Sequence, residues 1–512
     1  MVVCILDLGI GRHATLALLH RHVQSAATTR TGHVSPPSRQ HALTTGPIAK
    51  TLIVFSLPIL GSNVLQSLNV SVNSIWIGHF LGEAQLTASS NANLVLFLLL
   101  GSVFGISMAS TILIGQAMGA RKIDEAKRVF GTGITFFVGL ATVAAVGGFI
   151  FTPELLALMR TPPDAVPYAI AYLRVIFVAL PAMYFYILLR MTLRGAGDSH
   201  TPFWFMVLSV IVDISLNPLL IFGWGPVPAL GIAGSAAATL IAQVVALAGL
   251  LGYMYRRRHF LWLHRHEWHY LKPDWHILKA MVVKGLPMGM QMIVISSSGV
   301  VLITLINVYG SEMTAAYGAA LQLWRYIQMP ALAIGSAVAS MAAQNVGAGL
   351  WRRVDRVAGI GVAYNLIMTG ILVALTLIFS HQAIGLFLPG DSHALAMGQH
   401  LNAIVVWAFV FMSVSFVLFG VIRSTGAVIP PLVILAITLW GLRIPFAWLM
   451  RDHIGADAVW WSYPLASACT LVMALAYYRF GRWREAKMMK PPRAQVSTLG
   501  SDEPVVQPAP QD

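Results

Sequence analysis

Twelve apolar stretches, each close to 20 residues long, follow one another between about residue 48 and residue 478 of this 512-residue chain. A helix needs about 20 apolar residues to cross about 30 Å of hydrocarbon, so each stretch is long enough for one crossing. The composition agrees, because 57% of the residues are hydrophobic and only 10% are charged, which leaves too little polar surface for a soluble globular protein. The sequence therefore predicts an all-α polytopic membrane protein with twelve transmembrane helices.

Lys and Arg residues fall almost entirely on one side of these stretches. Basic clusters lie within 121–128, 256–272, 352–356 and 479–493, whereas the loops of the other side hold only Arg160 and Arg451 beside several acidic residues. Because cytoplasmic loops retain positive charge, we expect a multi-pass protein of the cell inner (plasma) membrane with both termini cytoplasmic. The net charge of +14 is divided among separate loops, so it does not predict a nucleic-acid partner.

These features divide the chain into five parts. We expect a disordered cytoplasmic tail at 1–45, a six-helix lobe at 46–256, a cytoplasmic linker at 257–275, a second six-helix lobe at 276–480 and a disordered cytoplasmic tail at 481–512. The single apolar patch of the first tail carries Asp7 and lacks a basic leader, which favours a tail over a signal peptide.

The two halves of the chain repeat the same short motifs. Three pairs recur: Leu57-Pro58 with Leu286-Pro287, Arg194-x-x-Gly197 with Arg423-x-x-Gly426, and Gln116-x-x-Gly119 with Gln344-x-x-Gly347. The first two pairs are 229 positions apart (287 minus 58, 423 minus 194) and the third is 228 apart (344 minus 116). Copies with six helices each and the same orientation are parallel repeats around an axis along the membrane normal, which places a central cavity between them.

Three Gly-rich runs add a more specific signal: Gly115-Gln116-Ala117-Met118-Gly119-Ala120-Arg121-Lys122, Arg194-Gly195-Ala196-Gly197-Asp198-Ser199-His200-Thr201-Pro202, and Gly231-Ile232-Ala233-Gly234 leading to Ala238-Thr239. In order, spacing and duplication they resemble the multidrug and toxic compound extrusion (MATE) family, over about residues 50–478. The resemblance implies an antiporter whose two lobes rock about the cavity. Such a protein exports amphipathic, often cationic drugs and toxins in exchange for H⁺ or Na⁺, and we expect no other cofactor.

Polar residues line one face of the predicted fifth helix. Ser209, Asp213 and Asn217 recur every four residues, and Asp213 lies about 18 Å from the helix start, near the middle of the membrane. An ionisable group at that depth is costly and points to function. The first and sixth predicted helices carry polar stripes that we expect to meet it. The predicted cation-coupling set is Asp213, Asn217, Asn73, Asn69 and Thr239.

The family resemblance is imperfect at this site. MATE proteins usually have an Asp where this chain has Asn73, and an Asn followed four residues later by an Asp where this chain has Asp213 and Asn217. With one carboxylate and no second negative ligand, the sequence favours H⁺ over Na⁺ as the coupling ion. Two structural alternatives remain open: an ion pair of Asp213 with Arg190 or Arg174, and amide stripes that only join helices.

Mixed apolar and polar residues predict the substrate cavity. The candidates are Gln66, Gln243, Gln291, Met292, Trp324 and Arg325. Flexible Met and aromatic side chains suit varied ligands, but in such helices they are more often packing residues. We expect Lys284 to reach the cytoplasmic interface and Arg325 to bond carbonyls or line the cavity. The expected partners are small amphipathic molecules and the lipid bilayer, and the expected state is a monomer.

Other functions have weaker support. A major-facilitator-type carrier would carry an acidic, Arg-rich loop where Gln116–Lys122 stands, and a lipid-linked oligosaccharide flippase of related fold would favour extra helices or a more cationic cavity. No Ser-Lys pair, paired His and acid, or metal motif lies within the spans, so we predict neither an enzyme nor a catalytic or metal site. His264, His266, Glu267 and His269 form the nearest metal-like cluster, and their place in the basic linker favours a solvated segment.

Overall fold

A computed structural model describes residues 43–223, 228–388 and 393–489. Within these ranges twelve helices are long and apolar enough to cross a membrane, which confirms the predicted all-α polytopic fold. Cys4 and most of the two predicted tails lie outside the described residues.

The first half of the chain contains seven helices among the described residues. They are α2 (Ile48–Phe80), α3 (Glu83–Gly119), α4 (Ile123–Ile150), the short α5 (Thr152–Leu158), α6 (Val166–Ala196), α7 (His200–Phe222) and α8 (Ile232–Arg256).

The second half follows after a short 3₁₀ segment, η2 (Arg265–Leu271). Its helices are α9 (Trp275–Asn307), α10 (Ser311–Gly347), α11 (Trp351–Ile378), the short α12 (Ser380–Gly385), α13 (His393–Val405), α14 (Trp407–Ser424), α15 (Ile429–Ala436), the π-helical η3 (Ile437–Arg443), α16 (Ile444–Ile454), α17 (Asp457–Phe480) and the 3₁₀ turn η4 (Trp483–Glu485).

Two spans of the second half are less regular than the sequence predicts. The tenth, expected at about 401–422, is divided at Val406 into α13 and α14. The eleventh, expected at about 429–450, passes through η3 between α15 and α16. Pro445 explains the second irregularity, because it has no N–H to donate to the carbonyl of Gly441, and a π-helical turn accommodates that break.

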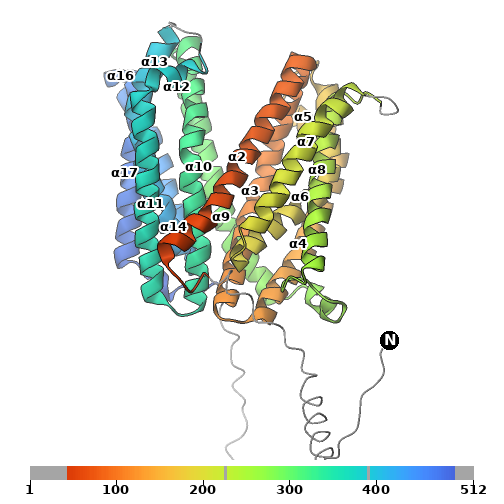
Figure 1. The fold of residues 1–512 in the computed structure, drawn as a ribbon. Coiled ribbons are helices and arrows are strands. Elements are labelled where there is room, and N and C mark those ends of the chain that lie inside the picture. Colours follow the sequence, from red (N-terminus) through yellow and green to blue (C-terminus); the bar gives the residue numbers. More distant parts are fainter. Residues whose placement is uncertain (1–42, 224–227, 389–392, 490–512) are drawn as a thin grey trace, which may run out of the picture. The chain divides into compact units, whose positions relative to one another are not determined.

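The first helix of each half packs across the halves (Figure 1). Leu52 and Phe55, on the first turns of α2, are buried in a core cluster made mainly by α10, α11, α14 and α15. Conversely, Met281 and Met288 of α9 are buried in the cluster formed by α3, α4, α6 and α8. The sequence-based boundary at 257–275 therefore separates the repeats but not the packing units.

The duplicated Gln-x-x-Gly motifs meet where α3 and α10 end. Gln116 Nε2 donates to the Ser424 carbonyl at 2.7 Å, and Gln344 Nε2 donates to the Gly195 carbonyl at 2.9 Å. The two acceptors are themselves repeat positions, since 424 minus 195 is 229. These four residues form the glutamine contact, a nearly symmetric connection between the halves.

Glycine is required at this crossing. A Cβ added to Gly119 would overlap the Gln344 carbonyl, and one added to Gly347 would overlap the Gln116 carbonyl. Backbone of the two halves is therefore in direct contact here. The loops at 120–122, 257–274 and 348–350 lie at this same end of the helices. We call it the basic end, and it is the expected cytoplasmic side.

The linker between α8 and α9 is anchored to α4. Lys127 Nζ lies 2.6 Å from Glu267 Oε1, and Thr135 Oγ1 donates to the Leu271 carbonyl at 2.6 Å. Around Glu267, the rings of His264 and His266 stack at 5.7 Å. In the described ranges no group of three or more His, Cys, Asp or Glu side chains is arranged to hold a metal ion.

Candidate functional site

Asp213 lies at the centre of a polar cluster among α2, α7 and α8. Asn69 Nδ2 donates to Asp213 Oδ2 at 2.6 Å, and Asn73 Nδ2 donates to the same oxygen at 3.3 Å. Asn217 Nδ2 donates to Oδ1 at 3.1 Å, and Thr239 Oγ1 lies 3.3 Å from Oδ1. The structure thus brings together the five residues that the sequence predicts as a set.

Asn217 connects α7 to α2 as well as to its own helix. Its Nδ2 donates to Asn73 Oδ1 at 2.9 Å and to the backbone carbonyl of Asp213 at 3.1 Å. Four-residue spacing places Asp213 and Asn217 one turn apart on the buried face of α7, and the same spacing aligns Asn69 with Asn73 on α2. The site is therefore formed where two polar stripes face each other.

The carboxylate is isolated from solvent and from basic groups. Asp213 is 1% exposed, and no Lys, Arg or His of the described ranges forms a salt bridge with it. The two predicted alternative partners lie elsewhere: the Arg190 guanidinium stands over the Tyr186 ring and that of Arg174 over the Phe149 ring. An ion-pair role for Asp213 is thereby excluded for these two residues.

Unpartnered oxygens surround this cluster. Asn69 Oδ1, Asn217 Oδ1 and Ser235 Oγ are buried and have no hydrogen-bond partner among the described residues. Because an amide can rotate to exchange its oxygen and nitrogen, either Asn can present an acceptor or a donor to Asp213. The cluster can therefore satisfy the ionised carboxylate with donors and the protonated acid with an acceptor. The same oxygens are hard ligands of the kind that Na⁺ accepts.

Aromatic rings pack together at the end of α2 beyond the polar cluster, on the side away from the basic end. Trp76 and Phe80, at the end of α2, lie with ring centroids 5.1 Å apart, and Phe222 packs edge-on against Phe80 at 5.3 Å. Trp76 is one turn beyond Asn73 on the same helix. Sequence reasoning overlooked these rings, although Trp76 and Phe80 form an i, i+4 pair that begins three residues after Asn73.

The second half contains a buried basic residue inside the eleventh predicted span. Arg443, 8% exposed at the end of η3, stands with its guanidinium carbon 3.5 Å from the centre of the Tyr463 ring. The Tyr463 hydroxyl lies 2.6 Å from the Tyr317 hydroxyl, and Trp324 donates to Asn402 Oδ1 at 3.0 Å. Sequence reasoning missed Arg443, although an Arg inside an apolar span two residues before a Pro is a detectable signal.

The predicted substrate-cavity residues do not form one cluster. Trp324 and Gln291 are buried, at 3% and 4% exposure, and pack within the second half, while Gln66 and Arg325 are exposed and Gln243 is half-buried. No hydrogen bond or ring contact joins any two of these side chains or Met292 in the part of the chain that is described.

Two basic residues near the basic end bond polar groups of the second half. Gln291 accepts from Arg423 Nη1 at 3.1 Å, and Lys284 Nζ donates to the Gly426 carbonyl at 2.8 Å. Gln291 and Lys284 thus link α9 to the segment around Gly426 at the basic end, and Gln291 is a packing residue there.

The MatE family model matches residues 58–219 and 287–449, one stretch in each half. The "Probable multidrug resistance protein YoeA" of Bacillus subtilis (strain 168) is 36% identical over 443 residues, which cover 86% of this chain and 95% of that protein. The "Multidrug export protein MepA" of Staphylococcus aureus (strain MSSA476) is 24% identical, covering 84% of this chain and 94% of its own.

Solved structures share the fold. A structure described as "Crystal structure of MATE in complex with MaL6" aligns with a TM-score of 0.80 at 20% identity, over 86% of this chain and 98% of its own. One described as "Outward-facing conformation of a multidrug resistance MATE family transporter of the MOP superfamily" aligns with a TM-score of 0.79 at 19% identity, over 86% and 97%.

Proposed function

Because the chain belongs to the MATE family of transporters, we propose that it exports amphipathic, often cationic drugs and toxins across the inner membrane in exchange for a cation, H⁺ rather than Na⁺. The observation that carries this proposal is the buried Asp213, surrounded by donors from three helices and by unpartnered amide oxygens. The names of the curated relatives, which concern multidrug resistance and export, support the substrate class.

The position of α2 links this site to the rest of the molecule. Its middle and outer turns carry Asn69 and Asn73, which bond Asp213 of α7, whereas its first turns pack with α10 of the other half. Protonation removes the negative charge that orients both amides, so it weakens the connection of α2 to α7. A helix held at one end by each half transmits that change to the contact between the halves.

Exchange of Asp213 tests the coupling. Asp213→Asn keeps the shape of the side chain and most hydrogen bonds but cannot bind and release a proton. We expect the variant to fold and bind a fluorescent cationic dye, and to lose dye transport driven by a pH gradient in everted vesicles. Transport that instead follows an imposed Na⁺ gradient in the unmodified protein would reject the H⁺ assignment. The matched control is Glu154→Gln, which neutralises an exposed acid on the short helix α5, outside the Asp213 cluster.

Substrate class and topology need separate tests. In a host without its own efflux pumps, expression should lower susceptibility to several lipophilic cations. Unchanged susceptibility together with export of a glycolipid would support the flippase alternative.

We also propose a monomer with both termini in the cytoplasm. Activity of a periplasmic reporter fused after Tyr478 would contradict that topology.

A further inference from the structure

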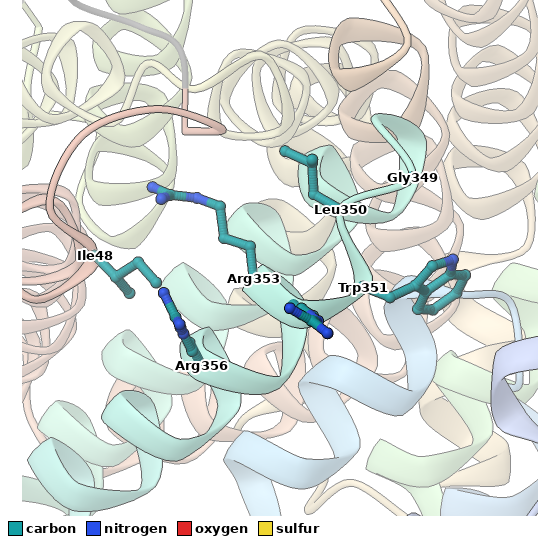
Figure 2. Close-up of a pocket in the computed structure, with 7 residues that line it drawn as sticks. Ile48, Gly349, Leu350, Trp351, Arg353 and Arg356 are labelled. Atoms are coloured by element: carbon teal, nitrogen blue, oxygen red, sulfur yellow. The ribbon is translucent and has the colours of Figure 1, made fainter.

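A pocket of about 490 Å³ lies at the basic end between the first turns of α2 and α11. Its walls are Ile48 of α2 and residues at the start of α11, namely Gly349, Leu350, Trp351, Arg352, Arg353 and Arg356. Figure 2 shows Arg353 and Arg356 extending from α11 toward Ile48, with Trp351 turned the other way. Guanidinium groups and apolar side chains therefore line the same pocket.

The three arginines of this pocket lack an acidic partner. None of them forms an ion pair with a residue in the described ranges, and Asp355, the acid of the same turn, instead pairs with Arg484 at 2.8 Å. Arg353 Nη2 donates to the carbonyls of Thr45 and Gly46, both at 2.9 Å, but its Nε is buried without a partner. Three guanidinium groups so close together, without a carboxylate among them, favour the binding of an anion.

The helix ends increase the positive potential. α2 and α11 both begin at this pocket, and neither has an acidic residue in its first turn or a side chain that caps its N-terminus. The first N–H groups of a helix are unpaired within it and carry a partial positive charge. Two such ends beside three guanidinium groups favour an anion, in particular a phosphate.

The repeat-related helix in the first half differs at these positions. The first turn of α4 carries Asp124 and Glu125, and 228 positions later the first turn of α11 carries Arg352 and Arg353 (352 minus 124, 353 minus 125). The start of α4 is thus balanced by its own carboxylates and packed against the linker through Glu267. The start of α11 has arginines at the corresponding positions, and a pocket lies beside it.

We propose that this pocket binds the phosphate headgroup of an anionic phospholipid, with Arg352, Arg353 and Arg356 as its phosphate ligands. A lipid is favoured over a soluble phosphate because the pocket also presents apolar surface. Ile48, Leu350 and Trp351 line it beside the arginines, and Leu350 is 41% exposed. An acyl chain can lie along that surface while the headgroup stays among the basic side chains at the interface.

Lipid titration of the purified full-length chain in neutral detergent tests the proposal. We expect phosphatidylglycerol to raise the apparent Tm and to be retained in native mass spectra, and phosphatidylcholine to do neither. The double variant Arg352→Gln/Arg356→Gln keeps Arg353, which holds Thr45 and Gly46. Since one basic residue near an anionic lipid contributes a fewfold in affinity, the double variant should bind phosphatidylglycerol roughly 10- to 30-fold more weakly.

A matched control separates a defined site from general positive charge. Arg121→Gln/Lys122→Gln removes two exposed charges from the repeat-related loop before α4, and should leave the affinity for phosphatidylglycerol unchanged. Equal weakening in both double variants would overturn the proposal, as would equal binding of phosphatidylcholine. The same stabilisation by inorganic phosphate alone would assign the pocket to a soluble anion and also reject the lipid.

Discussion

A carboxylate can couple transport to a proton only if its surroundings accept both of its protonation states. Asp213 meets this condition through amides that donate to it now and that hold unpartnered oxygens within the same cluster. The resemblance to MATE proteins leads one to expect carboxylates at position 73 of α2 and position 217 of α7, whereas this chain has its carboxylate at position 213 of α7. The structure reconciles the two patterns, because Asn73 Nδ2 lies only 3.3 Å from Asp213 Oδ2.

The first prediction exchanges these two positions. Asn73→Asp/Asp213→Asn moves the carboxylate to α2 without leaving the cluster, where it accepts from Asn217 Nδ2, already 2.9 Å from Asn73 Oδ1. We expect the double variant to recover much of the pH-driven dye transport that Asp213→Asn loses. Asn73→Asp alone places two like charges side by side, so the pH dependence of its transport should differ from that of the unmodified chain. A double variant as inactive as Asp213→Asn would show that position 213 itself is required.

Glu267 provides a second prediction, outside the membrane spans. Burial would by itself raise the pKa of this carboxyl, but hydrogen bonds from Lys127 and from the His264 backbone, with the nearby positive charges, outweigh burial and lower the pKa. A carboxyl with a lowered folded-state pKa stabilises the protein above its ordinary pKa, about 4.3, and that contribution is lost as the pH falls through the lower folded value. With both side chains 13% exposed or less, the pair contributes about 1 kcal/mol.

Thermal unfolding in detergent measures this contribution. The apparent Tm of the unmodified chain should fall as the pH drops below about 4.3. Glu267→Gln should already have a lower Tm at neutral pH and should lose less on acidification. Identical acid sensitivity of both proteins would contradict the assignment to Glu267.

At the scale of helices, the sequence predicts whether an element exists better than how regular it is. Apolar length alone locates all twelve spans, because every crossing must satisfy its backbone hydrogen bonds internally. The break at Val406 and the π-helical η3 were not predicted, since apolar length carries no information about local hydrogen-bond pattern. Pro445 alone does not predict the π-helical η3, because a proline can also end a helix; it explains η3 once the structure shows that the helix continues past residue 445.

For the candidate site, too, the sequence predicts some features and not others. Four-residue spacing places Asn69 with Asn73, and Asp213 with Asn217, because a helix of known span fixes which residues share a face. The structure brings these two faces and Thr239 of α8 into contact. The choice of Trp324 and Gln291 as cavity residues rested on residue type alone. Residue type does not distinguish a cavity wall from a packed interior, and both side chains are buried.

The third prediction concerns Arg443 on η3. Tyr463→Leu removes the ring beneath the guanidinium and leaves a buried cation without a partner, which should lower stability by roughly 2–4 kcal/mol. Tyr463→Phe keeps the ring and loses only the hydroxyl contact with Tyr317, about 1 kcal/mol. Thermal unfolding of the purified variants measures both. Tyr463→Leu/Arg443→Leu should recover part of the loss, and a strictly additive double variant would show that the two residues do not interact.

At the scale of the whole molecule, the two halves are joined at the basic end by backbone. In the glutamine contact each half donates one hydrogen bond to the other: Gln116 to Ser424, and Gln344 to Gly195. Gly119 and Gly347 let α3 and α10 cross without a Cβ between them. A nearly symmetric contact of this kind opens as a unit, because each half contributes both a donor and an acceptor. If the halves rock during export, this contact must break once in every cycle.

The fourth prediction follows from that requirement. Gly119→Val inserts side-chain carbon where the Gln344 carbonyl now lies, so the basic ends of α3 and α10 must separate. Spin labels at Lys122→Cys and Leu350→Cys, both on the exposed surface, should report a longer distance than in the same labelled protein without the Val, in a background lacking Cys4 and Cys469. Gly139→Val is the control, since a Cβ there meets nothing within 4 Å.

A milder variant guards against simple misfolding of Gly119→Val. Gln116→Ala/Gln344→Ala removes the two hydrogen bonds of the glutamine contact, about 1 kcal/mol each, and also the bond from the Leu43 N–H to Gln344 Oε1, without adding bulk. The loss of the two bonds between the halves should shift the population toward the longer distance roughly 30-fold. If α2 couples the basic end to Asp213, as we propose, that coupling is reciprocal, and this shift should also alter the pH at which dye transport is half-maximal. A lengthened label distance with an unchanged pH profile would separate the glutamine contact from the proton site and reject α2 as the element that links them.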